Sequence, residues 1–184
     1  RTGGTTTTWV WDTANSRLTV SGGVNALLLY TAISKKDIDI IIDIDQADAA
    51  GIVWRRTDNS NFYELDIFDA SSNAGTTNKM RLFKVVANSK TQLGTDITIS
   101  FTRSTKKRIR ASMIGTAINV YFDGTNVRST TDSSLTTAGL AGLINVSGSA
   151  QHYNLRIQPI GDNLSGMKVY VRATLTSDNP LLTP

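Results

Sequence analysis

The chain has 184 residues, enough for one domain with a substantial core, and its 40% hydrophobic and 18% charged content is typical of a folded globular protein. Its net charge of +4 is mild, it has no cysteine, and His152 is its single histidine, which excludes disulfides, thiolate metal sites and multi-histidine zinc sites. No run approaches the roughly 18 apolar residues of a membrane span. We therefore expect no cofactor, no bound metal and no membrane partner.

Short strand-like runs separated by turn residues follow one another along most of the chain. The first, "TWVWDT", sets Trp9 and Trp11 on one face, where we expect them to pack against the core. Turns such as "TANS", "TDNSN" and "DGTN" separate about a dozen such runs, and none of the runs shows a helical period beside a cap. We predict an all-β fold of two antiparallel sheets packed face to face, a sandwich or jelly roll.

Residues 35–45, "KKDIDIIIDID", separate into two faces. Every second position from Ile38 to Ile44 is isoleucine, and the positions between them, from Asp37 to Asp45, hold four aspartates. A calcium loop is the competing interpretation, but it needs a glycine turn and a distant glutamate, and this run has neither. We predict a strand with a buried isoleucine face and a row of solvated carboxylates that forms one candidate binding patch.

In the next run, "AGIVWRRTD", neither face of the expected strand is cleanly apolar. Trp54 shares a face with Ile52 and Arg56, whereas Val53 shares the other face with Arg55. We therefore expect Trp54 or Arg55 to point outward, and both are candidates for ligand contact.

The run "NFYELDIFD" predicts a strand that places Tyr63, Leu65 and Ile67 in the core. Glu64 and Asp66 should then lie on its outer face, where they form a second candidate binding patch.

Residues 106–124 predict a hairpin with one polar face. Alternation assigns to the core the residues Ile109, Ala111, Met113, Ile118, Val120 and Phe122. Arg108, Arg110, Asn119 and Tyr121 should then share one exposed face, where a tyrosine beside guanidinium groups offers a platform for a sugar or a phosphate. The alternative is a solvated face whose arginine stems cover Tyr121. We expect no nucleic-acid binding, because that needs a larger basic stripe interleaved with aromatic residues.

The last strand of the sandwich should end near Ile160, so residues 1–160 form the predicted domain. Residues 161–184 contain a turn, one more strand-like run, "KVYVRATL", and a proline-bracketed tail. We interpret them as an extension or connector to a further domain. Because the chain starts with Arg1 instead of methionine, we expect it to be part of a larger assembly, with oligomerisation left open.

Several motifs occur in the order found in a known family. They are Trp54-Arg55, Asn61-Phe62-Tyr63, Val120-Tyr121-Phe122-Asp123-Gly124 and Gly139-Leu140-Ala141-Gly142-Leu143. Across residues 9–160 the chain resembles the concanavalin A-like jelly roll of laminin-G-like and related bacterial carbohydrate-associated domains. The resemblance implies the fold and a carbohydrate partner. One departure is Tyr153, which stands where the family commonly has aspartate.

Glycosidases with this kind of fold carry Glu-x-Asp-x-x-Glu on one strand, where two carboxylates act on one glycosidic bond. The chain has Glu64, Asp66 and Asp69 at these positions. The third carboxylate is one methylene shorter, and regular alternation places Asp69 on the opposite face from Glu64 unless a bulge intervenes. Catalysis by these three residues is therefore the minority hypothesis.

The expected function is a non-catalytic module that binds polysaccharide at a bacterial surface. The tail "VYVRATLTSDNPLLTP" is similar to segments of bacteriophage tail and baseplate proteins, which implies a phage adhesion protein located in the virion or outside the cell. Two alternatives remain open: a glycosidase using Glu64, Asp66 and Asp69, and a structural or decorating module without a soluble ligand.

Overall fold

A computed structural model describes residues 8–22, 25–69 and 78–161. Within these ranges the chain forms twelve strands and no helix, and hence no helix that could cross a membrane. The strands are β1 (Thr8–Asp12), β2 (Arg17–Ser21), β3 (Ala26–Lys35), β4 (Ile38–Asp58), β5 (Asn61–Phe68), β6 (Lys79–Val86), β7 (Ser89–Gln92), β8 (Ile97–Thr98), β9 (Lys107–Ile114), β10 (Ala117–Phe122), β11 (Thr125–Thr131) and β12 (Gly139–Pro159). The extension expected at 161–184 lies outside the described residues, apart from Gly161.

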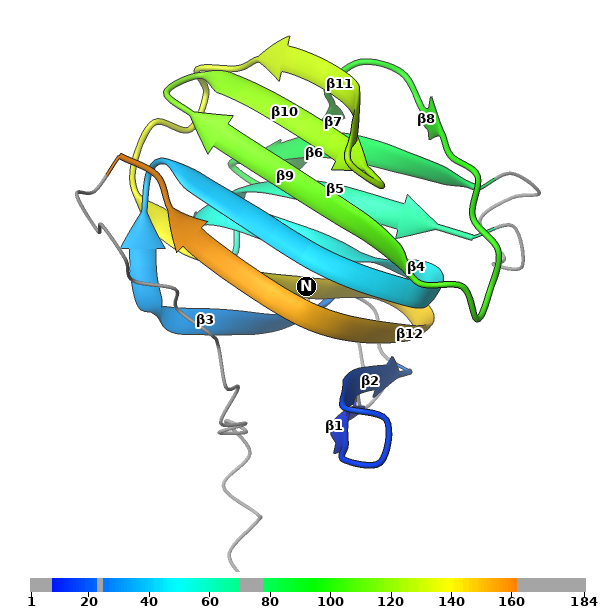
Figure 1. Cartoon of the computed structure of the whole chain (residues 1–184). Helices are drawn as coiled ribbons and strands as arrows, with labels where there is room; N and C mark the ends of the chain where they lie inside the picture. Colours follow the sequence, from blue (N-terminus) through cyan, green and yellow to red (C-terminus); the bar gives the residue numbers. More distant parts are fainter. Residues whose placement is uncertain (1–7, 23–24, 70–77, 162–184) are drawn as a thin grey trace, which may run out of the picture.

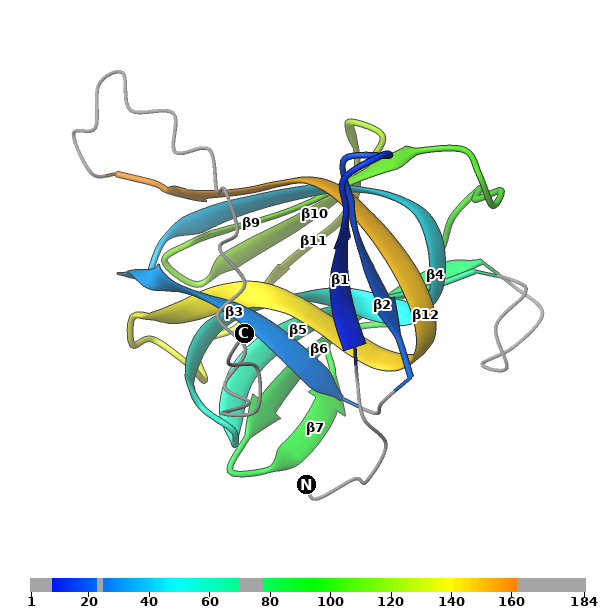
Figure 2. The ribbon, with the colours of Figure 1, turned by 90° about the horizontal axis from the view of Figure 1, so that it is seen from below.

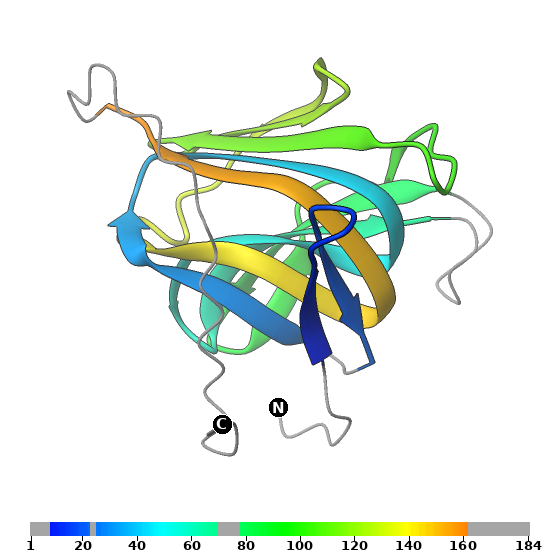
Figure 3. The ribbon, with the colours of Figure 1, turned by 60° about the horizontal axis from the view of Figure 1, so that its bottom comes forward.

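The strands form two antiparallel layers that share β4 and β12 (Figures 1 and 3). Residues 38–44 of β4 pair with β9, whereas residues 50–58 pair with β5. β12 follows β4 through both layers, pairing with β2 in one and with β3 in the other. We call the layer β11-β10-β9-β4-β12-β2-β1 sheet I and the layer β3-β12-β4-β5-β6-β7 sheet II; β8 pairs with β6. The predicted two-sheet sandwich is confirmed.

β4 and β12 are each one continuous strand of 21 residues, although the sequence predicts the runs at 35–45 and 50–58 as separate strands. The two halves of each strand belong to different sheets, so the chain bends between them (Figure 3). In β4 the small buried residues Ala47, Ala49 and Ala50 lie at this bend. At Gly51 a Cβ would lie 1.9 Å from the backbone oxygen of Leu65, so only glycine allows this close approach of β4 to β5.

The main core lies between the sheets and follows the predicted alternation. Ile38, Ile40, Ile42 and Ile44 are at most 1% exposed, and each fully buried isoleucine contributes about 2 kcal/mol of apolar burial. Of the other residues predicted for this core, Trp9 and Phe122 are only partly buried. The expectation for Trp11 is wrong, because it is 50% exposed on β1, the edge strand of sheet I. The remaining predicted core residues are buried: Tyr63, Leu65, Ile67, Ile109, Ala111, Met113, Ile118 and Val120. Residues 38–45 therefore form a strand, as predicted. The expectation of solvated carboxylates is wrong for Asp43 and Asp45, which are 7% and 9% exposed, because Arg108 and Tyr153 of the neighbouring strands pair with them.

A second, smaller apolar cluster lies on the opposite face of sheet II. It contains Val53, Phe62, Val85 and Ile144, all buried. These residues alternate in sequence with core residues of the same strands, so both faces of sheet II are apolar in this region. Sheet I has no such cluster among the described residues, and its outer face is polar.

The hairpin between β10 and β11 turns through Asp123 and Gly124, whose φ angles are 47° and 83°. Two successive left-handed residues match the right-handed twist of the flanking strands, which explains the Asp-Gly pair. At the other edge of sheet I, the β1–β2 hairpin extends the layer beyond β12 (Figure 2).

Candidate functional site

The outer face of sheet I gathers polar side chains from three neighbouring strands, β10, β9 and β4. Tyr121 of β10 pairs with Arg110 of β9, and Asp43 of β4 pairs with Arg108 of β9. The predicted hairpin is present, with Asn119 opposite Ser112. We call the set Asp39, Asp43, Arg108, Arg110, Asn119 and Tyr121 the polar face. Two patches that the sequence suggested separately, the aspartate row and the arginine–tyrosine hairpin, thus form one surface.

Ion pairs between adjacent strands fix the side chains of the polar face. Arg108 binds Asp43 through two hydrogen bonds, from Nε at 2.7 Å and from Nη2 at 2.9 Å. Nε of Arg110 donates to Asp39 at 2.7 Å, and its guanidinium lies 4.7 Å from the ring centre of Tyr121. Tyr121 therefore lies beside a guanidinium group, as predicted, and this group lies over the tyrosine ring, as in the alternative of a covered tyrosine. The pairing of Arg110 with Asp39 was not predicted.

Asp43 is held in its charged form. Burial alone would raise the pKa of this carboxyl, but hydrogen bonds from Arg108 and from the amide of Asn154 outweigh burial and lower the pKa below its usual value. Asn154 reaches Asp43 from β12 at 2.8 Å and has a φ of 51°, within an irregular stretch of the β12–β4 pairing. The lowered pKa favours the charged form of Asp43, so the ion pair orients Arg108 before any ligand arrives.

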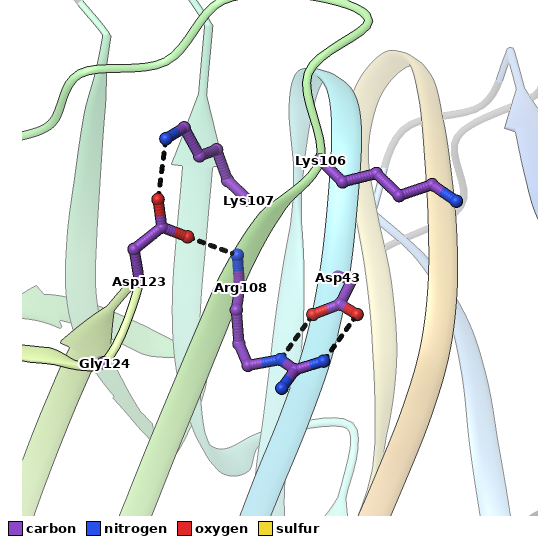
Figure 4. Close-up of a pocket in the computed structure, with 6 residues that line it drawn as sticks. All are labelled: Asp43, Lys106, Lys107, Arg108, Asp123 and Gly124. Atoms are coloured by element: carbon purple, nitrogen blue, oxygen red, sulfur yellow. Dashed lines mark hydrogen bonds and ion pairs between the residues drawn. The ribbon is translucent and has the colours of Figure 1, made fainter.

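A cleft of about 490 Å³ lies at the end of the polar face where β9 begins (Figure 4). Its lining consists of Asp43, Lys106, Lys107, Arg108, Asp123 and Gly124. Asp123 accepts hydrogen bonds from Nζ of Lys107 at 2.7 Å and from the backbone N–H of Arg108 at 2.9 Å. Burial would raise the pKa of Asp123, but these contacts lower it, so this wall of the cleft also carries a compensated charge.

Lys106 lines the cleft and contacts Tyr153 of β12. The ammonium nitrogen of Lys106 lies 4.0 Å from the ring centre of Tyr153. The Tyr153 hydroxyl donates to Asp45 at 2.6 Å, which fixes the ring beneath the lysine. Tyr153 is the residue that stands where the family resembled by the sequence commonly has aspartate.

Glu64 and Asp66 lie on the outer face of β5, as predicted, but they are only 2% exposed. Nζ of Lys90 on β7 donates to both carboxylates at 2.9 Å and lies 4.1 Å from the ring centre of Phe83. Burial, reinforced by the hydrogen bond with Glu64, raises the pKa of Asp66 well above its usual value. These acids line neither cleft described here.

Asp69 lies beyond the end of β5 and belongs to a different cluster. Its side chain forms an ion pair with Nε of Arg103 at 2.9 Å and accepts a hydrogen bond from the backbone N–H of Ala47 at 3.2 Å. The structure therefore assigns Glu64 and Asp69 to separate charge clusters, each with its own cation.

The expectation that Trp54 or Arg55 points outward is wrong, because both are buried, at 1% and 0% exposure. Arg55 has a φ of 48° and lies where the pairing of β4 with β5 is irregular, which interrupts the alternation. Trp54 stacks on Tyr63 with ring centres 5.8 Å apart. Arg55 donates to the backbone oxygens of Lys36, Leu135 and Gly115 and to the carboxylate of Asp37, so it holds three connecting segments together.

A second cleft, of about 330 Å³, is lined by Lys84, Thr116, Thr131, Asp132, Ser133 and Ser134. Asp132 accepts hydrogen bonds from Lys84 and from the Tyr63 hydroxyl, both at 2.8 Å. Burial and the contact with Asp132 raise the pKa of Tyr63 to about 12. Burial would raise the pKa of Asp132, but hydrogen bonds, first among them the one from Lys84, lower this pKa to about 2. The two charged groups of this cleft therefore neutralise each other.

Within residues 8–22, 25–69 and 78–161 no group of three or more histidine, cysteine, aspartate or glutamate side chains is arranged to hold a metal ion. His152 is 2% exposed and lies 6.0 Å from the ring of Trp9, and burial lowers its pKa to about 4. This histidine is part of the core.

Sequence reasoning missed the roles of Lys106, Tyr153 and Lys90. A signal for Lys106 was present, since alternation in "KKRIR" places it on the same side as Arg108 and Arg110. Nothing in the local pattern indicates that Tyr153 or Lys90 lies beside its partners, because those contacts join strands far apart in the chain.

Known protein-family models and curated proteins give no match to the chain. Among solved structures, the carbohydrate-binding module CBM66 from Bacillus subtilis is 18% identical with a TM-score of 0.67. The matched region covers 83% of this chain and 92% of the CBM66 chain. The GH43 protein BlXynB from Bacillus licheniformis is 13% identical with a TM-score of 0.62, covering 82% of this chain but 34% of its own. Toad ovary galectin, in a complex with N-acetylgalactose, is 15% identical with a TM-score of 0.54, covering 73% of this chain and all of its own. At these identities the similarity shows the fold, a jelly roll.

Proposed function

We propose that the chain is a non-catalytic carbohydrate-binding module that binds polysaccharide on the polar face and in the adjoining cleft. The observation that carries the proposal is the fixed array of planar polar groups: Arg108 on Asp43, and Arg110 on Asp39 beside Tyr121. A carbohydrate-binding module and a galectin share the fold, which supports the same class of ligand here.

This array suits the chemistry of sugars. A sugar ring presents hydroxyl groups that bond to guanidinium and carboxylate groups, and C–H faces that pack on aromatic rings. Arg108 and Arg110 have 59% and 39% exposed side chains, yet their ion pairs already hold them in place. A ligand therefore meets groups that lose little further conformational entropy on binding.

For the biological setting, we propose polysaccharide of a bacterial cell surface as the ligand and a phage adhesion protein as the parent molecule. The support is the similarity of the C-terminal sequence to phage tail and baseplate segments. In that setting the module is one part of a larger assembly, in the virion or outside the cell.

Binding is favoured over catalysis because the carboxylates that a glycosidase would use are engaged elsewhere. Glu64 and Asp66 are buried beneath Lys90, and Asp69 pairs with Arg103. A catalytic acid must reach the glycosidic oxygen, and neither cleft described here contains these side chains. The chain also covers only about a third of the GH43 protein, so that similarity carries no activity with it.

The test is to label a panel of bacteria with a fluorescent fusion of the chain. We expect labelling that purified wall polysaccharide from the labelled strain abolishes. Tyr121→Ala and Arg110→Gln should weaken labelling about tenfold, since each removes a polar or stacking contact. The matched control is Arg81→Gln, which removes an arginine of β6 in sheet II that pairs with Asp96. This variant should label normally.

The other hypotheses predict different outcomes of the same experiment. Release of reducing ends from the polysaccharide that is lost in Glu64→Gln would establish a glycosidase and overturn the proposal. Absence of both labelling and release across a broad glycan panel would favour the structural or decorating module.

A further inference from the structure

The hydrogen-bond acceptors that line the cleft are already engaged. Asp43 accepts from Nε and Nη2 of Arg108 and from Asn154, and the two oxygens of Asp123 accept from Lys107 and from the backbone of Arg108. Figure 4 shows both carboxylates facing their cationic partners. A ligand in the cleft therefore finds little free carboxylate to accept its hydroxyl protons.

The donors that line the cleft are less fully used. Lys106 makes no hydrogen bond or ion pair to any residue of the described chain, so its three N–H groups have no acceptor there. Arg108 uses Nε and Nη2 on Asp43 and leaves Nη1 without a partner among the described residues. The lining contains three cations and two carboxylates, which leaves one positive charge in excess.

Lys106 is held in a defined position despite having no acid partner. Its side chain reaches across β4 toward β12 (Figure 4), where its ammonium lies over Tyr153. Tyr153 is in turn fixed by its hydrogen bond to Asp45, so its ring holds the Lys106 ammonium in place through a cation–π contact. At the opposite rim, the hairpin tip at Gly124 is open, because a Cβ there would meet nothing within 4 Å.

We infer that the cleft selects an acidic polysaccharide, whose carboxylate or phosphate groups bind Lys106 and the free edge of Arg108. This inference rests on the proposed function and specifies its ligand. An anion accepts from both free donors and neutralises the excess charge, whereas a neutral sugar does neither. The neighbouring polar face then binds the uncharged part of the polymer.

The experiment measures affinity for polysaccharide purified from a labelled strain in three forms: native, carboxyl-reduced, and dephosphorylated with hydrogen fluoride. We expect one of the two neutralised forms to bind at least about tenfold more weakly than the native form, since it loses the charge-assisted hydrogen bonds, which are stronger than neutral ones. Weaker binding of the carboxyl-reduced form would identify uronate carboxylates as the bound groups, and weaker binding of the dephosphorylated form would identify phosphates. Binding to the native form should also fall as salt rises.

Two variants assign the effect to Lys106. Lys106→Gln should bind native polymer about tenfold more weakly and the neutralised polymer as wild type does. Its melting temperature should fall by no more than about 4 °C, because it loses the contact with the Tyr153 ring but no hydrogen bond within the described fold. Lys79→Gln removes one positive charge from β6 of sheet II and should bind like wild type.

Equal affinity for native and both neutralised polymers, with Lys106→Gln unaffected, would overturn the inference and leave the proposed function standing. Failure to bind any of the three forms would overturn both. Single-stranded DNA is a further probe, and binding to it that equals binding to native polymer would overturn the assignment to polysaccharide.

Discussion

The outer faces of the two sheets use the same chemistry in opposite ways. On sheet I, Arg108 and Arg110 are 59% and 39% exposed, and their partners Asp43 and Asp39 are 10% and 12% exposed. On sheet II, Lys90 is 24% exposed, and its partners Glu64 and Asp66 are only 2% and 3% exposed. In both places a cation on one strand meets carboxylates on another. The difference lies in how much of the cluster water reaches.

That difference separates a binding surface from a structural contact. An exposed ion pair contributes about 0–1 kcal/mol to stability, so the pairs of sheet I serve mainly to orient groups that a ligand can reach. A buried carboxylate needs its cation, because an unpaired charge in a low-dielectric environment is strongly destabilising. The comparison predicts that equivalent substitutions on the two sheets have different consequences.

The largest effect should follow from Lys90→Met, which leaves Glu64 and Asp66 buried without a cation. We expect a loss of about 3 kcal/mol in the free energy of unfolding, measured by urea denaturation at pH 7. A loss below about 1 kcal/mol would show that water reaches these acids and that the two faces do not differ as described.

A second effect concerns the pH dependence of stability. The pKa of Asp66 is raised in the folded state, so above pH about 4 the folded protein keeps a proton that the unfolded chain has lost. The stability that this proton provides is complete below pH 4 and is lost as the pH rises through the raised pKa. Asp66→Asn should abolish this loss, so the difference in unfolding free energy between wild type and variant should change with pH across this window.

The difference between wild type and Asp66→Asn is the right quantity because His152 acts in the opposite direction. Burial lowers the pKa of His152 to about 4, so its contribution is lost as the pH falls below its ordinary value near 6.5. Both proteins contain His152, and its contribution cancels in the comparison. A difference that is flat from pH 4 to pH 8 would contradict the burial of Asp66.

The smallest effect on stability should follow from Arg108→Met on sheet I. Its partner Asp43 keeps the hydrogen bond from Asn154, and the arginine is mostly exposed, so we expect a loss below about 1 kcal/mol. Binding of polysaccharide should nevertheless weaken. A stability loss as large as that of Lys90→Met would remove the distinction between the faces.

Alternation of side chains made most of the core predictable. The runs at 38–44, 63–67 and 109–113 each direct their apolar side chains to the core, and in the two runs of sheet I a slip of one residue would turn these side chains to the polar outer face. The rule failed at Arg55, because a residue with positive φ in an irregular pairing turns both Trp54 and Arg55 inward, and no local pattern signals that.

The candidate site was predictable within a hairpin and unpredictable between distant strands. The sequence placed Arg108, Arg110, Asn119 and Tyr121 together because a short turn joins their strands. It could not show that the aspartates of β4 lie beside these arginines, since 65 residues separate Asp43 from Arg108 and their contact depends on the order of strands in the sheet. For the same reason, the sequence could not predict the contact of Lys106 with Tyr153 or the ion pair of Lys90 with Glu64.

The most direct test of the binding face is backbone hydrogen–deuterium exchange of the chain with and without polysaccharide from a labelled strain. We predict added protection at 106–123 and in the first half of β4, with β5, β6 and β7 unchanged. Protection confined to β5, β6 and β7, or no added protection at saturating polysaccharide, would contradict the assignment of binding to the outer face of sheet I.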